Sequence, residues 1–365
     1  MQVETPRRVF ITDCEGPVSK NDNAFELVSH FVPDGEKLFM QVSKYDDVLA
    51  DLVKREGYKA GDTLKLVLPF LKASEVTDKQ MADFSARNVL LMPGAKETLQ
   101  SVRSLMPVFI VSTSYEHYLK ALCSALGFPS KNAYYTRLEL DAYKMDEKDK
   151  ELLERLRREI CTLPLIEIPK EATSVSMLSQ ASQQAVRRLD EVFWEEIMQL
   201  ESSAFLRKVN PMGGVEKAKA ARRISDKNDI DLGRVMYVGD SITDVECLKQ
   251  VKNSGGLAVS FNGNIYAVRE AAVAVLSPNA ISIAVLAETF HRCGVESVYG
   301  LIDEWSYSSM KKHGVNRSLQ ERLQTIFGRE LPKLYKITAE NLEEAATEST
   351  AFRRLVRGEK VGRLG

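Results

Sequence analysis

The 365-residue chain is 44% hydrophobic and 28% charged, which is ordinary for a globular protein with a large core and one or two accessory modules. Its 50 basic and 51 acidic residues nearly cancel, which argues against a nucleic acid or an anionic membrane as partner. We see no apolar signal or membrane-spanning segment, and five scattered cysteines without a CxxC pair argue against disulfides and thiolate zinc, so we expect a cytoplasmic protein.

The first predicted strand is the β-branched and aromatic run at residues 9–12. Asp13 follows it directly, and Gly16 and Pro17 then force a turn. Ligands of parallel α/β sheets bind at the carboxyl ends of the strands. Asp13 and Glu15 on such a turn could divide the roles of nucleophile and acid/base, although a solvated acidic turn explains them equally well on this segment alone.

Two later stretches interrupt the α/β pattern with helices. Apolar periodicity and a Thr77-Asp78 cap predict helices throughout residues 18–88, without a strand signal. Residues 141–205 read as a charged helix, a proline-punctuated connector, and one long amphipathic helix over 177–205. We interpret both stretches as helical inserts.

Alternating strands and helices fill the rest of the sheet domain. The predicted strands cover residues 107–112, 133–140, 234–239, 256–260 and a last one at 272–276. From about residue 280 the chain is helical and increasingly charged, and its basic end, 353–365, is expected to fray. The predicted domains are an α/β core (1–16, 89–140 and 206–290), a helical cap (17–88), a helical insert (141–205) and a helical extension (291–365).

Four short motifs lie at strand ends or helix starts. They are Asp13-Cys14-Glu15-Gly16, Ser112 after an apolar strand, Lys217 in the first turn of a helix, and Gly239 to Asp244 after another strand. Each has an ordinary explanation, because Ser112 could cap a helix, Lys217 could be solvated, and Gly239-Asp240 could be a plain turn. Their order along the chain favours one shared site.

With these motifs the sequence resembles the haloacid dehalogenase superfamily, whose members are mostly magnesium-dependent phosphatases. The resemblance covers roughly residues 6–16, 90–140 and 206–280. Within the superfamily, the sequence is most similar to phosphoserine-phosphatase-like members. These have a helical cap after the first motif and, before the second motif, a segment like Met92-Pro93-Gly94. The resemblance implies a Rossmann-like α/β core with a parallel sheet, an inserted helical cap, a second helical insert and a helical C-terminal tail.

The resemblance also implies a role for each motif residue. Asp13 would be the nucleophile that forms an aspartyl-phosphate, and Glu15 the acid/base. A Mg²⁺ ion would neutralise charge and be bound by Asp13, the Glu15 carbonyl and Asp240, with Asp244 as a further ligand or as the holder of a bound water. The substrate-binding residues would be Ser112, Thr113, Lys217 and Asp22.

Three positions leave alternatives open. The family has Asp where this chain has Glu15, whose extra methylene puts efficient hydrolysis in question. Met212 stands at one usual lysine position, so we assign the role to Lys217, with Lys208 as the alternative. Asp22 could read a substrate amine or simply cap a helix.

The sequence thus predicts a Mg²⁺-dependent phosphatase for a small phosphorylated metabolite. A phosphotransferase or phosphomutase of the same superfamily is the alternative within enzymes. The alternative outside enzymes is a catalytically silent binding or scaffold protein, with partner surfaces on residues 141–205 and beyond 290. The sequence also leaves open whether the chain forms a homodimer.

Overall fold

The computed structural model describes residues 7–169, 171–362 and 364, and expectations for residues 1–6, 170, 363 and 365 lie outside it. In the described part, seven strands form one sheet in the order β3-β2-β1-β4-β5-β6-β7. The strands are β1 (Val9–Thr12), β2 (Val108–Tyr115), β3 (Ala133–Thr136), β4 (Val235–Gly239), β5 (Leu257–Phe261), β6 (Val273–Leu276) and β7 (Lys333–Lys336). All neighbours pair in parallel except β6 and β7, so the predicted α/β fold is confirmed.

The central strands are buried on both faces, as expected for a parallel sheet between helical layers. Phe10 of β1 lies opposite Val108 of β2 and Met236 of β4. This register brings the carboxyl ends of β1, β2 and β4 together at one edge. The turn that follows β1 therefore lies beside the segments that follow its two neighbours.

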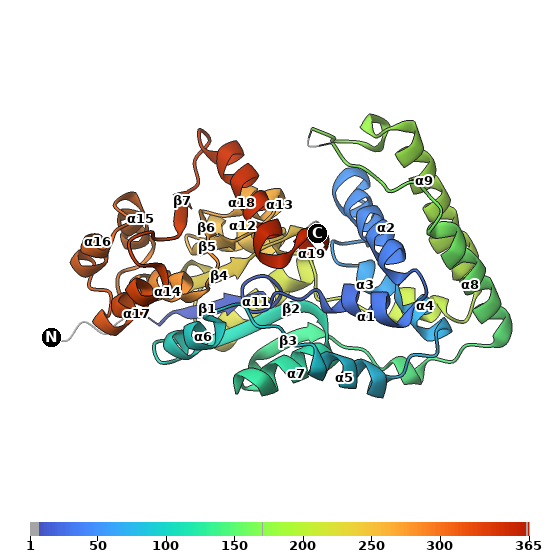
Figure 1. Ribbon diagram of the computed structural model, residues 1–365, viewed down its shortest axis with the longest axis horizontal. Coiled ribbons are helices and arrows are strands. Elements are labelled where there is room, and N and C mark those ends of the chain that lie inside the picture. Colours follow the sequence, from blue (N-terminus) through green and yellow to red (C-terminus); the bar gives the residue numbers. More distant parts are fainter. Residues whose placement is uncertain (1–6, 170, 363, 365) are drawn as a thin grey trace.

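Helices cover both faces of this sheet (Figure 1). One face packs on α6 (Ala95–Arg103), α7 (Glu116–Leu126), α14 (Ile281–Cys293), α15 (Val295–Asp303), α16 (Tyr307–Lys312) and α17 (Arg317–Phe327). The opposite face packs on α11 (Val215–Lys227) and α12 (Val245–Asn253), with α13 (Ile265–Glu270) nearby. Gly127 ends α7 in the left-handed conformation that favours glycine at a helix C-terminus.

The two stretches that interrupt the sheet pattern form one helical body beside the sheet (Figure 1). Its helices share a hydrophobic cluster that is separate from the clusters of the sheet. They are α1 (Asn23–Phe31), α2 (Gly35–Asp47), α3 (Thr63–Leu66), α4 (Leu68–Ala73), α5 (Asp78–Arg87), α8 (Glu147–Ile160), α9 (Gln180–Glu191) and α10 (Ser203–Lys208).

The structure corrects three expectations about elements. The helix expected over residues 177–205 is broken, because α9 passes into a π-helical turn and a 3₁₀ turn before α10 begins. Residues 272–276 do not contain the last strand, since β7 adds an antiparallel edge. Finally, β2 runs on to Tyr115, so Ser112 lies inside the strand rather than after it.

The C-terminal residues are also ordered more than predicted. Helix α18 (Leu342–Arg357) packs on α13 and β6, and the short α19 (Glu359–Gly362) follows it. Arg353 is buried in this arrangement, so the expectation that the described residues from 353 onward fray is wrong. The physical reason is that Arg353 and Arg357 form ion pairs with Asp240, which lines the pocket described below.

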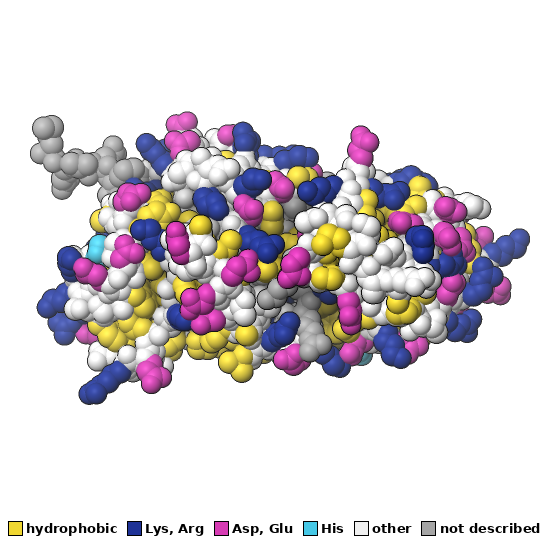
Figure 2. All heavy atoms as spheres, turned by 90° about the horizontal axis from the view of Figure 1, so that it is seen from above, with side chains coloured by type: hydrophobic (Ala, Val, Ile, Leu, Met, Phe, Trp, Pro, Cys, Tyr) yellow, Lys and Arg dark blue, Asp and Glu magenta, His cyan; other side chains and the backbone are white. Residues whose placement is uncertain are grey.

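The surface carries charges of both signs. Figure 2 shows basic and acidic side chains interspersed over the face it presents, without one large patch of either sign. Among the helices of the described residues, none combines the length and the apolar character that a membrane crossing requires.

Candidate active site

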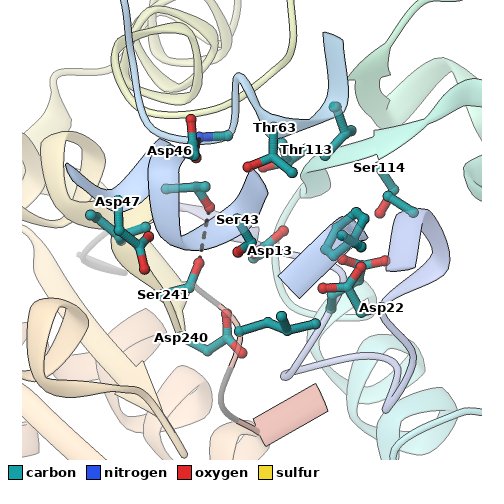
Figure 3. Close-up of a pocket in the computed structure, with 18 of the residues that line it drawn as sticks. Asp13, Asp22, Ser43, Asp46, Asp47, Thr63, Thr113, Ser114, Asp240 and Ser241 are labelled. Atoms are coloured by element: carbon teal, nitrogen blue, oxygen red, sulfur yellow. Dashed lines mark hydrogen bonds between the residues drawn. The ribbon is translucent and has the colours of Figure 1, made fainter. Parts of the chain in front are cut away.

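A pocket lies at the carboxyl edge of β1, β2 and β4, where the helical body faces the sheet (Figure 3). The carboxyl ends of these three strands, and the residues just after them, contribute Asp13, Thr113, Ser114, Asp240 and Ser241. The helical body contributes a second side of the pocket, formed by Ala24, Phe39, Ser43, Asp46, Asp47, Gly61, Thr63 and Leu64.

Asp13 is held in the pocket by two opposed contacts. Its Oδ1 accepts the N–H of Cys14 at 2.7 Å, and its Oδ2 lies 2.7 Å from the Nζ of Lys217. Burial raises the pKa of Asp13 to about 8, with Asp244 and Asp240 adding to the rise and Lys217 opposing it. A carboxylate in this position is poorly hydrated and would be stabilised by an additional cation.

Gly16 permits the close approach of the first turn to Asp240. Its φ is +102°, and a Cβ built there would lie 2.1 Å from the Oδ2 of Asp240. Only glycine fits both the backbone conformation and this space.

Lys217 is fully buried in the first turn of α11 and bridges Asp13 to Asp244, at 2.7 and 2.8 Å. Burial alone would lower the pKa of Lys217, but the two carboxylates raise it above its ordinary value. The solvated reading of Lys217 is therefore wrong. The alternative residue, Lys208, is exposed at the end of α10 and lines a different pocket with Glu116.

Asp244 uses both of its carboxylate oxygens within the protein. Its Oδ1 accepts from Lys217 and from the hydroxyl of Tyr237, and its Oδ2 accepts the N–H groups of Asp240 and Ser241. Burial opposes ionisation, but Lys217 and these donors hold the pKa of Asp244 below its usual value. Its carboxylate has little capacity left for direct metal ligation, and it orients Lys217 and the turn after β4.

Asp240 has partners that sequence reasoning missed. The guanidinium of Arg353 contacts its Oδ2 and donates to its backbone carbonyl, and Arg357 lies 3.0 Å from the same Oδ2. The available signal was the spacing of four residues, which puts both arginines on one face if the segment is helical, whereas the sequence predicted that it would fray. Nothing in the sequence indicates that this face meets Asp240.

Glu15 and Asp22 both line the pocket at the start of α1. Glu15 accepts the N–H of Asn23 at 2.8 Å, so its longer side chain reaches the first residue of the helix. Burial, and then the neighbouring Asp22, raise the pKa of Glu15 well above its usual value. Asp22 accepts the N–H of Phe25 at 3.0 Å, which shows the capping role while keeping the side chain at the pocket.

The residues at the end of β2 divide their contacts. Ser112 is buried and donates to the hydroxyl of Ser114 at 3.2 Å, and Thr113 donates to the carbonyl of Met212 at 3.3 Å. Thr113 and Ser114 line the pocket, whereas Ser112 is not one of its lining residues. Ser114 was missed by sequence reasoning, although its place two residues after Ser112 on a strand indicates a shared face.

The donor set fits a hard divalent cation. One carboxylate oxygen each from Asp13, Asp240 and Asp244 lies within 4.8 Å of the others, and all three side chains are buried. Because protein donors occupy both oxygens of Asp244, Asp13 and Asp240 are the carboxylates that could ligate the cation directly. Among the described residues that line the pocket, six are acidic and two are basic. Oxygen ligands in an electronegative cavity are what Mg²⁺ prefers.

A family model described as haloacid dehalogenase-like hydrolase matches residues 95–282, a little over half of the 365 residues. The chain therefore belongs to the haloacid dehalogenase-like hydrolases, as the four motifs predict. No curated protein matches the chain.

Among solved structures, gene product AF1437 from Archaeoglobus fulgidus is similar to this chain with a TM-score of 0.79 and 28% identity, over 99% of both chains. A substrate-bound phosphoserine phosphatase matches at 0.46 and 13% identity, over 77% of this chain and 98% of its own. A phospho-aspartyl intermediate analogue of phosphoserine phosphatase matches at 0.44 and 14% identity, over 76% and 97%. The last two scores do not assign a branch of the family.

Proposed function

We propose that this hydrolase is a Mg²⁺-dependent phosphatase that cleaves a small phosphorylated metabolite through an aspartyl-phosphate on Asp13. The observation that carries the proposal is the buried Asp13–Lys217–Asp244 chain beside Asp240, at the carboxyl edge of β1 and β4. Membership in the haloacid dehalogenase-like hydrolases supports it.

Asp13 would attack phosphorus, forming an Asp13–O–P bond while the ester P–O bond breaks. Lys217 would offset negative charge on Asp13 and the phosphoryl group. Bound Mg²⁺, held by Asp13, Asp240 and the Glu15 carbonyl, would supply the remaining charge neutralisation.

Glu15 would give its proton to the leaving oxygen in the first step. In the second step a water attacks phosphorus and returns a proton to Glu15, the Asp13–O–P bond breaks, and inorganic phosphate leaves. The raised pKa of Glu15 favours the protonated form that the first step needs. Thr113 and Ser114, at the end of β2, would contact the phosphoryl group.

The helical body formed by residues 17–88 and 141–205 would cover the pocket as a cap and exclude water from the first transfer. The described cysteines are free thiols, which supports a cytoplasmic location.

The test is hydrolysis of a generic aryl phosphate with and without Mg²⁺. We expect metal-dependent turnover by the wild-type chain, loss of turnover in Asp13→Asn, and retention in Asp83→Asn, whose side chain is exposed on α5. The unfolding temperature of each variant checks that it is folded. Undiminished turnover by a folded Asp13→Asn protein would contradict the mechanism.

A further inference from the structure

Helix α18, which lies outside the family-matched residues, contributes side chains to the pocket. Arg353 and Arg357, one turn apart on α18, each have side chains that are only 3% exposed. Both guanidiniums contact the Oδ2 atom of Asp240. Both arginines lie in the C-terminal extension, beyond residue 282 where the family match ends, and neither belongs to one of the four motifs.

The contacts engage one side of the Asp240 carboxylate. Among the described residues, no hydrogen-bond donor to its Oδ1 is found, whereas Oδ2 receives both arginines. Arg353 also donates to the backbone carbonyl of Asp240 at 3.1 Å, which fixes the residue at two points. Outer contacts of this kind orient a ligating carboxylate and leave its other oxygen for a cation.

Both arginines also donate to backbone carbonyls, which remain hydrogen-bond acceptors when a cation binds Asp240. Arg357 donates through Nε to the carbonyl of Lys20 at 3.2 Å and through Nη2 to the carbonyl of Asn21. Arg353 donates to the carbonyl of Leu364 at 3.2 Å. Because these acceptors are backbone carbonyls, the guanidiniums keep partners when the charge on Asp240 is balanced by a metal.

The anchor at Lys20 and Asn21 has a further consequence. These residues join the catalytic turn to α1, so they form one of the connections between the sheet and the helical body. Arg357 therefore links three separate segments: the C-terminal helix, the turn after β4, and the entry to the helical body.

The position of α18 itself is fixed by packing. Ala345 and Ala346 belong to a hydrophobic cluster with β6, and the buried Ser349 donates to the carbonyl of Gly263 at 2.7 Å. The helix thus presents its last two turns to Asp240 from a rigid support.

From this geometry we infer that Arg353 and Arg357 are positioning residues, which hold the Asp240 carboxylate in the orientation that a divalent cation requires. The C-terminal extension is then a component of the active site and not an appendage. The inference rests on the proposed function to the extent that it takes Asp240 as a metal ligand.

The test is Mg²⁺ binding to the full chain, measured by titration calorimetry in Arg357→Gln, Arg357→Lys and Arg354→Gln. We expect the Kd of Arg357→Gln to rise about 10- to 100-fold, the usual loss when an outer partner of a ligand is removed. Arg357→Lys keeps the charge but cannot reach Asp240 and the carbonyls of Lys20 and Asn21 together. Its Kd should therefore lie between the Kd of Arg357→Gln and that of the wild type. Arg354 is exposed on the same helix, and its variant should bind like the wild type.

Binding by Arg357→Gln that is equal to or tighter than wild-type binding would overturn the inference, because it would mean that the arginines compete with the cation. Absence of Mg²⁺ binding by the wild-type chain would also overturn it. If Mg²⁺ binds as expected but no phosphate ester is hydrolysed, the proposed function fails and the positioning role stands. Should Arg357→Gln not fold, the ratio of Kd values for Arg357→Lys and the wild type decides.

Discussion

The charged side chains at the centre of the pocket are buried, so they are stabilised by one another and not by bulk solvent. Lys217 is fully buried between Asp13 and Asp244, and Asp244 is saturated by protein donors. Removing one member of such a group leaves its partner charged, buried and unpaired, which typically destabilises a protein by several kcal/mol. Variants that keep size and hydrogen bonding, such as Asp→Asn, therefore separate chemistry from folding better than alanine variants do.

Glu15 gives the first prediction. In Glu15→Gln the side-chain oxygen can still accept the N–H of Asn23, but no proton is available for the leaving group. We expect kcat for an alkyl phosphate to fall about 10²- to 10⁴-fold, and less for an aryl phosphate, whose leaving group needs little protonation. Comparison of kcat for the two substrates provides the measurement.

A Glu15→Gln enzyme with wild-type kcat on both substrates would remove Glu15 from the chemistry. The same assay with an alcohol acceptor present distinguishes hydrolysis from phosphotransfer in the wild-type protein. We expect inorganic phosphate as the main product; a transferred phosphate ester as the main product would favour the phosphotransferase alternative.

Asp46 gives a prediction about pH. Burial raises its pKa to about 7, although the hydroxyl of Tyr58 and the N–H of Gly61 donate to its two oxygens. The unfolded value is about 3.9, so this group's contribution to stability is full below about pH 4 and is lost as pH rises through 7. Between pH 5 and 7 the loss is on the order of 2 kcal/mol.

In Asp46→Asn this part of the pH dependence should disappear. Urea unfolding of both proteins at pH 5 and pH 7 measures it, and the wild type should lose more unfolding free energy than the variant. Equal losses in the two proteins would show that Asp46 ionises in the folded state as it does in the unfolded state.

At the scale of elements, α18 is held to the sheet by a face of small residues. Ala346 is 1% exposed in the cluster with β6, whereas the neighbouring Thr347 is exposed. We expect Ala346→Asp to destabilise the protein by about 3 kcal/mol or more, because it buries an unpaired charge. Thr347→Asp is the matched control and should change stability by less than about 0.5 kcal/mol.

Thermal unfolding of these two variants measures the difference. Similar unfolding temperatures for Ala346→Asp and Thr347→Asp would mean that α18 does not pack on the sheet in solution. That result would also remove the structural basis for the contacts of Arg353 and Arg357 with Asp240.

The elements that could be predicted from sequence are those whose pattern is decided by burial alone. β1 and β4 are continuous apolar runs because both of their faces are covered. β7 is different: its sequence is Lys-Leu-Tyr-Lys, all of its side chains are at least partly exposed, and its strand form depends on pairing with β6. Short edge strands of this type have no strong local signal.

The same distinction applies to the pocket. Asp13, Asp240 and Asp244 follow buried strands, and Lys217 begins a helix, so their meeting at one edge could be anticipated from topology. The partners of Asp240 could not be anticipated from the sequence. Arg353 is more than a hundred residues away along the chain, and the fold brings it back to Asp240 through β7 and α18. A contact that depends on tertiary packing leaves only a helical spacing in the sequence.

At the scale of the whole molecule, the C-terminal segment joins the sheet to the helical body. Val361 and Leu364 pack in the hydrophobic cluster of the helical body, and Lys360 pairs with Glu36 of α2 at 2.8 Å. Figure 1 shows α19 between the two parts. The pocket is thus enclosed by segments from the beginning, middle and end of the chain.

The comparison with gene product AF1437 spans 99% of both chains, so the likeness includes the helical inserts and the C-terminal segment. The similarity therefore extends over the whole arrangement of sheet, helical body and C-terminal segment. This whole arrangement, and not the α/β core alone, encloses the candidate site.

The central claim is that Asp13 carries the phosphoryl group during turnover. The direct measurement is acid quenching during hydrolysis of an aryl phosphate with Mg²⁺, followed by mass spectrometry of the peptide that contains Asp13. The account predicts a phosphoryl group on Asp13 that disappears when substrate is exhausted. Hydrolysis that proceeds with Asp13 unmodified and the phosphoryl group on another residue would contradict it.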